Sequence, residues 1–130
     1  MTSIVYFFLI SSLLKDNIKE DKGCIINITD AMVIRGMKDY SIYSTAKGGL
    51  ETLTKSLARD LAPEITVNAV APGAILLPSD GSSNEELLLS KIPLGRLGTE
   101  ADIASAVFYL SKNKYITGQV LRVDGGRSLN

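Results

Sequence analysis

Histidine and tryptophan are absent from this sequence, and cysteine occurs once, at Cys24. Without histidine, no triad built on a histidine base can form, and a zinc site would lack its usual ligands. A single cysteine excludes a disulfide framework. Fourteen basic and fourteen acidic residues cancel, so the chain lacks the broad positive field typical of proteins that bind nucleic acid or anionic membranes. We therefore expect no metal, no nucleic acid and no membrane as partners.

The sequence also has no apolar run long enough to span a bilayer. Its most apolar stretch, residues 3–14, has no basic residue ahead of it and no small-residue cleavage pattern after it. We interpret this stretch as part of a buried helix over 2–17, with an export signal as the less favoured alternative. The absence of a targeting element predicts a cytoplasmic location.

Apolar residues make up 45% of the 130 residues, which is ample for one packed domain. Their spacing predicts helices over 2–17, 41–61 and 85–91. A further helix begins after Thr99, which can cap it with Asp102 in a capping box, and runs through Leu110. The polar segment 77–84 is typical of a mobile lid, and 31–40 is expected to be a loop.

Short apolar runs predict three strands, at 24–28, 65–70 and 119–123. The first is rich in β-branched residues and fits a strand buried on both faces, with Cys24 as a small core residue. The alternation of helices and strands indicates an α/β fold with a parallel sheet and right-handed crossovers. No linker or repeat divides the chain.

The candidate chemistry centres on Tyr43, Lys47 and Asp30. Tyr43 and Lys47 are four residues apart on a predicted helix, so they lie on one face about a turn apart. A nearby ammonium lowers the pKa of a phenol and makes it a better acid. Asp30 follows the first strand, at the sheet edge where ligands bind in open parallel sheets. Alone, the pair could be two surface residues and Asp30 an ordinary turn residue.

The motifs as a set resemble the short-chain dehydrogenase/reductase family. They are I-I-N-I-T-D-A at 25–31, Y-S-T-A-K-G-G-L at 43–50, T-K-S-L-A-R-D-L-A-P at 54–63, V-N-A-V-A-P-G at 67–73, R-L-G-T-E-A-D-I-A at 96–104 and Y-I-T-G-Q-V-L-R-V-D-G-G at 115–126. Their order matches the carboxyl-terminal half of that fold. The resemblance implies a truncated Rossmann-like sheet of about three parallel strands with flanking helices, and one partial domain over 1–130.

At Asp30 the sequence is similar to the pteridine reductase branch, since most members of the family carry a serine there. The resemblance implies that Tyr43 is the general acid and that Asp30 contacts a pterin and relays protons. Lys47 would bind the nicotinamide ribose and lower the pKa of Tyr43. The implied reaction is hydride transfer from NADP(H) to a dihydropterin or dihydrofolate ring.

The resemblance further implies that Tyr43, Lys47 and the segment Pro72, Gly73, Ala74 and Ile75 contact the cofactor. An ordinary turn after a strand is almost as good a reading of Pro72-Gly73. No glycine-rich turn follows a strand and opens a helix anywhere in the 130 residues. We therefore expect a chain that holds NADP(H) weakly and is inactive on its own, with residues 24–28 forming an apolar sheet edge.

Two alternatives stay open. The chain could be a non-catalytic remnant that forms homo-oligomers through the helices at 2–17 and 41–61, which the resemblance places at subunit interfaces. The substrate could also be a ketone or an acyl thioester, although Asp30 disfavours this. The sequence leaves NADPH or NADH, the exact substrate and the oligomeric state undecided.

Overall fold

The computed structural model describes residues 23–75 and 85–130. The strands are β1 (Cys24–Ile28), β2 (Thr66–Pro72) and β3 (Val120–Val123). The helices are α2 (Ser41–Asp60), α3 (Glu85–Ser90) and α4 (Glu100–Lys112), with short 3-10 helices η1 (Ala31–Arg35) and η2 (Arg127–Leu129). The predicted helix at 2–17 and the predicted lid at 77–84 lie outside the described residues.

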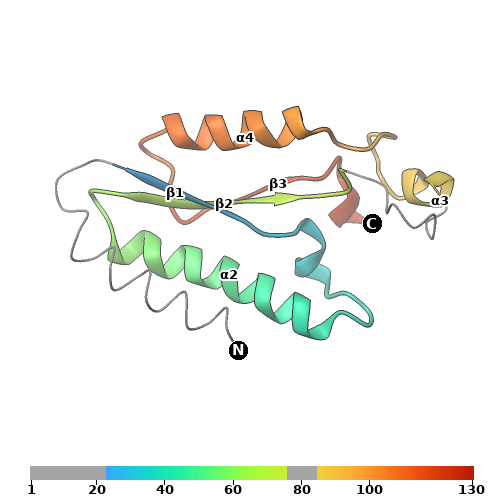
Figure 1. Ribbon diagram of the computed structural model, residues 1–130, viewed down its shortest axis with the longest axis horizontal. Coiled ribbons are helices and arrows are strands. Elements are labelled where there is room, and N and C mark those ends of the chain that lie inside the picture. Colours follow the sequence, from blue (N-terminus) through green and yellow to red (C-terminus); the bar gives the residue numbers. More distant parts are fainter. Residues whose placement is uncertain (1–22, 76–84) are drawn as a thin grey trace.

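The three strands form one parallel sheet in the order β1-β2-β3. Helix α2 covers one face of this sheet and α4 covers the other (Figure 1). The predicted α/β fold, with a small parallel sheet and flanking helices, is confirmed. Every predicted strand is present, with ends displaced by up to two residues.

The register brings the carboxyl ends of the strands to one edge. Ile28 pairs with Val70, and Pro72 pairs with Val123. Beyond the last β1 residue, the Thr29 amide still donates to the Val70 carbonyl at 2.9 Å. The segments that leave β1, β2 and β3 therefore start side by side, on the side of the sheet where η1 and η2 lie (Figure 1).

Strand β2 supplies the core. Five of its seven residues are buried in an unbroken run, as expected for a central parallel strand covered by helices on both faces. Leu57 and Ala58 of α2 pack in a cluster with Val67. From the other face, Leu110 of α4 is 2% exposed.

Strand β1 differs from the prediction. Its central residues are only partly buried, Ile28 is 44% exposed and Cys24 is exposed, so Cys24 is not a core residue. The physical reason is position in the sheet: among the described strands β1 pairs only with β2 and lies at an edge. The expected apolar edge is confirmed for this part of the chain.

Local signals place the helix ends correctly. Helix α2 ends at Asp60 with Leu61 as its C-cap, before Pro63, and the predicted capping box of Thr99 and Asp102 opens α4. Segment 31–40, expected to be a loop, instead contains η1, because the Asp30 carboxylate caps its first turn. Neither α2 nor another helix within 23–75 and 85–130 is long and apolar enough to cross a membrane.

Candidate active site

Asp30 and Tyr43 meet at the carboxyl edge of the sheet. Asp30 follows β1 and caps η1, where its Oδ1 accepts from the Met32 amide at 2.8 Å. Its other oxygen, Oδ2, accepts from the Tyr43 hydroxyl at 2.9 Å. Asp30 therefore has both the turn role and the contact with Tyr43 that the sequence offered as alternatives.

Lys47 lies one turn along α2 from Tyr43. Its Nζ donates to the Ile28 carbonyl at 3.0 Å and lies 6.0 Å from the centroid of the Tyr43 ring. The ammonium is thus held by the last carbonyl of β1, beside the phenol and not against its oxygen. The structure brings Asp30, Tyr43 and Lys47 together, while their catalytic roles stay predictions.

The electrostatics of Tyr43 differ from the sequence expectation. Partial burial, together with the hydrogen bond to Asp30 and the negative charge of Asp30, raises the pKa of Tyr43 to about 12. The expected lowering by Lys47 does not occur in this arrangement. The carboxylate contacts the hydroxyl directly and favours its protonated form, whereas Lys47 bonds to a backbone carbonyl.

The predicted cofactor segment from Pro72 to Ile75 leaves β2 at the same edge. The Gly73 amide donates to the Val123 carbonyl at 2.9 Å, and the Ala74 carbonyl accepts from the Gly98 amide at 2.9 Å. A Cβ on Gly73 would lie 2.6 Å from the Asp124 Cα. Packing against β3 therefore explains glycine at this position, and the cofactor contacts of the segment remain a prediction.

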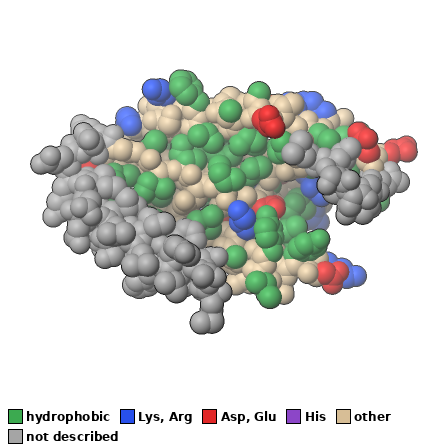
Figure 2. All heavy atoms as spheres, in the orientation of Figure 1, with side chains coloured by type: hydrophobic (Ala, Val, Ile, Leu, Met, Phe, Trp, Pro, Cys, Tyr) green, Lys and Arg blue, Asp and Glu red, His purple; other side chains and the backbone are tan. Residues whose placement is uncertain are grey.

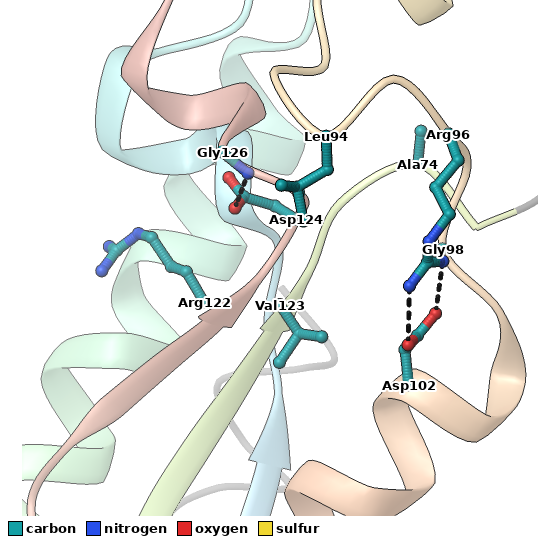
Figure 3. Close-up of a pocket in the computed structure, with 10 residues that line it drawn as sticks. Ala74, Leu94, Arg96, Gly98, Asp102, Arg122, Val123, Asp124 and Gly126 are labelled. Carbon is teal, nitrogen blue, oxygen red and sulfur yellow. Dashed lines mark hydrogen bonds and ion pairs between the residues drawn. The ribbon is translucent and has the colours of Figure 1, made fainter.

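A cavity of about 310 Å³ lies beside this segment (Figure 3). Its walls come from the residues after β2, before and within α4, and at the end of β3: Ala74, Leu94, Arg96, Gly98, Asp102 and 122–126. Three of these side chains are already hydrogen-bonded, because Arg96 bonds Asp102 at 2.9 and 3.1 Å and Asp124 accepts from the Gly126 amide. Arg122 extends away from Arg96, to the side of α2 (Figure 3).

Sequence reasoning missed this cavity, whose walls join segments about fifty residues apart. It also missed Glu51 on α2, which bonds Thr29 and Arg122. The spacing of Glu51 was a usable signal, because it lies four residues after Lys47 on the same helix face. Within the described ranges, no group of three or more histidine, cysteine, aspartate or glutamate residues could hold a metal ion.

The nicotinamide end of a dinucleotide fits what the described residues present. Lys47 bonds the Ile28 carbonyl at the edge where β2 ends at Pro72, and the neighbouring Tyr43 side chain is 40% exposed. These groups could hold a ribose and a nicotinamide ring there. For the pyrophosphate, the 130 residues contain no glycine-rich turn of the usual kind.

Comparisons with known proteins agree with the fold. A family profile described as enoyl-(acyl carrier protein) reductase matches residues 2–128. A 3-oxoacyl-[acyl-carrier-protein] reductase of Bos taurus is 44% identical over 89% of this chain and 49% of its own length. Carbonyl reductase family member 4 of Danio rerio is 39% identical over 99% of this chain and 57% of its own length.

A solved structure, that of an apo SCOR enzyme from Clostridium thermocellum, superposes with a TM-score of 0.82 at 36% identity. It covers 95% of this chain and 49% of the solved chain. The chain thus spans about half the length of the relatives it matches. On the evidence of the profile, the relatives and the fold, this chain belongs to the short-chain dehydrogenase/reductase family.

Proposed function

We propose that the complete protein is an NADPH-dependent pteridine reductase, which reduces a C=N bond of a dihydropterin or dihydrofolate ring. The observation that carries the proposal is the hydrogen bond from the Tyr43 hydroxyl to the Asp30 carboxylate at 2.9 Å. Where most of the family is expected to have a serine hydroxyl, this chain has an acceptor already joined to the proton donor.

The chemistry of the substrate decides between a carboxylate and a hydroxyl. An ionised carboxylate only accepts hydrogen bonds, and so does the oxygen of a ketone or thioester carbonyl. Placing these two oxygens together gives no hydrogen bond, and the negative charge that develops on the carbonyl oxygen would be repelled. A pterin offers N–H donors to Asp30 and a ring nitrogen that takes up a proton, so it suits this site better.

In the proposed reaction, NADPH supplies the hydride that reaches the carbon of the C=N bond. Tyr43 gives its hydroxyl proton to the ring nitrogen, and the ionised Asp30 then takes a proton from water and passes it to the phenolate. The edge is open enough for water to reach this pair, since the Tyr43 side chain is 40% exposed. Lys47, fixed by the Ile28 carbonyl, places a positive charge 6.0 Å from the phenol ring and stabilises the transient phenolate.

The strongest competing substrate is an acyl thioester or ketone. It is favoured by the names of the relatives, which are 3-oxoacyl-[acyl-carrier-protein] reductases and carbonyl reductases. Those proteins are about twice as long as this chain, so their substrates are carried over only as an alternative. The two candidates differ in what Asp30 does, and this difference makes them separable.

The test compares the full-length gene product with its Asp30→Ser variant on two substrates, 7,8-dihydrobiopterin and acetoacetyl-CoA, by following NADPH oxidation. We expect the variant to lose pterin turnover by about 10²-fold or more, the range of a lost acid–base group, and to retain or gain thioester turnover. Equal pterin turnover in both proteins, or turnover of the thioester alone, would overturn the pterin assignment.

For the 130-residue chain we propose no measurable turnover, because its sequence contains no glycine-rich turn to hold the cofactor pyrophosphate. The check is NADPH-dependent dihydropterin reduction by the purified chain. Activity that disappears in Tyr43→Phe would contradict this statement, whereas activity that survives the substitution would indicate a contaminating reductase.

A second candidate role is self-association through α2. Tyr40 and Ile42, at the start of this helix, are 59% and 87% exposed, so this apolar surface is available to a second copy. Light scattering after size exclusion would detect the assembly, and Ile42→Asp should convert it to a monomer. A chain that is monomeric before the substitution would exclude this role.

A further inference from the structure

A polar seam joins one face of α2 to the end of β1. Four consecutive positions, 27 to 30, each contact a different turn of the helix. The Asn27 amide donates to Thr54 Oγ1 at 2.9 Å. Lys47 reaches the carbonyl of residue 28, and Tyr43 reaches Asp30. The seam therefore ends in the candidate catalytic pair.

Glu51 is the one carboxylate within this seam on the helix side. Its Oε1 accepts from the Thr29 hydroxyl at 3.3 Å, and its Oε2 accepts from Arg122 Nη2 of β3 at 3.4 Å. The Glu51 side chain is 14% exposed, that of Arg122 is 26% exposed, and Thr29 is 4% exposed. A single side chain thus connects the ends of two strands that are not neighbours in the sheet.

We propose that Glu51 is a positioning residue, which ties Thr29 to Arg122 and thereby fixes the segment that presents Asp30 to Tyr43. Thr29 is the residue immediately before Asp30, and its amide bonds β2 while its hydroxyl bonds Glu51. With both groups held, the backbone leading into Asp30 has little freedom. The value of this role for catalysis rests on the proposed function, whereas the positioning itself does not.

Loss of the Glu51 carboxylate would also leave the positive charge of Arg122 without its partner. Breaking a largely buried ion pair by removing one member leaves the other charge uncompensated. Arg122 already has a buried Nε with no protein partner, so loss of Glu51 would leave this guanidinium more poorly satisfied. We expect Arg122 and the end of β3 to shift, and Thr29 and Asp30 to lose their support.

The test measures the ionisation of Tyr43 by NMR of the chain labelled with ¹³C at tyrosine Cζ, with Tyr43→Phe to assign the signal. At pH 10 a phenol of pKa about 12 is about 1% ionised, whereas one at the ordinary value near 10 is about half ionised. We expect the ionised fraction of Tyr43 to rise several-fold in Glu51→Leu and in Thr29→Val, and to rise less in Glu51→Gln, which keeps an acceptor for Thr29 but places an amide donor against Arg122.

Glu64→Gln, at an exposed glutamate, is the matched control and should leave Tyr43 unchanged. If Glu51→Leu does not fold, Thr29→Val decides, since it removes only a hydroxyl. Folded Thr29→Val with an unchanged Tyr43 signal would overturn the proposal, as would an equal rise in the Glu64→Gln control. Because the readout needs neither pterin nor NADPH, its failure is distinct from failure of the proposed function.

Discussion

Two aspartates at the carboxyl edge of this sheet, Asp30 and Asp102, have the same local task and different partners. Each accepts a hydrogen bond from a backbone amide at the start of a helix, Asp30 from Met32 and Asp102 from Thr99. The remaining oxygen of Asp30 faces a phenol, whereas Asp102 also faces the guanidinium of Arg96.

The partners determine what each carboxylate can do. The hydrogen bond from Arg96, with those from Thr99, holds the pKa of Asp102 well below its usual range. Asp102 is therefore locked as an anion and serves structure. Asp30 instead bonds a neutral group whose proton it can exchange. Under the proposed function the α2 end of the edge transfers protons, whereas the bonds at the α4 end stabilise the fold.

The largest expected effect is on the proton-transfer end. Tyr43→Phe in the full-length protein should lower the turnover number by about 10² to 10⁴-fold, because the proposed proton donor is lost while packing is kept. Steady-state kinetics with NADPH and dihydropterin measures this. Tyr40→Phe is the control, since its ring lies 6.5 Å from that of Tyr43 and does not contact Asp30 in any described bond. A similar loss of turnover in Tyr40→Phe and Tyr43→Phe would contradict the proposed role of Tyr43 as the proton donor.

At the stability end, Gly73→Ala should cost about 1–3 kcal/mol of unfolding free energy, the range for overpacking. The new methyl group would lie 2.6 Å from the Asp124 Cα and would push β2 from β3. Urea denaturation measures the change. The control is Gly49→Ala within α2, where nothing lies within 4 Å of the added Cβ, and there we expect no loss. A tolerated Gly73→Ala would refute the packing explanation for this glycine.

A smaller loss is expected at the helix cap. Thr99→Ala removes the side-chain acceptor of the Asp102 amide and should cost about 1 kcal/mol of unfolding free energy. Thermal and urea unfolding would report it, with Thr99→Ser as the variant that should restore most of the stability. A cost as large as that of Gly73→Ala would mean that the cap supports more than α4.

The smallest effect concerns acidification. Because the folded state lowers the pKa of Asp102, the aspartate contributes stability that is present above its unfolded pKa near 4 and is lost as pH falls below it. Unfolding free energies at pH 7 and pH 3 should therefore differ less in Asp102→Asn than in the unmodified chain. An equal acid sensitivity in both would show that other carboxylates govern it.

How far apart two partners lie in the chain explains which contacts could be predicted from the sequence. The Thr99–Asp102 cap and the end of α2 before Pro63 were predicted because the partners are adjacent in the chain. Asp30, Tyr43 and Lys47 were found through spacing and resemblance. The contacts that the sequence could not give join distant segments, as in the bond of Glu51 to Arg122, seventy-one residues away.

The direction of the pKa shift of Tyr43 was harder to predict than the positions of the residues around it. The sequence correctly places an ammonium one turn from a phenol, but the fold decides that Lys47 bonds the Ile28 carbonyl and that Asp30 accepts from the hydroxyl.

The exposure of Cys24 likewise depends on which strands flank β1 and not on the apolar character of residues 24–28. In Figure 2, apolar side chains gather on the visible face at the level of the sheet.

The most direct test of the account is the ionisation of Tyr43 with and without the Asp30 carboxylate. At pH 10, tyrosine Cζ NMR should find Tyr43 almost entirely protonated in the unmodified chain, since its pKa is raised to about 12, and several-fold more ionised in Asp30→Asn, which removes the contribution of Asp30 but not that of burial. Asp39→Asn, which removes a carboxylate two residues before α2 begins, should leave it protonated. A Tyr43 that is half ionised at pH 10 in the unmodified chain, or whose ionisation does not change in Asp30→Asn, would contradict the hydrogen bond between Tyr43 and Asp30 on which the proposed function depends.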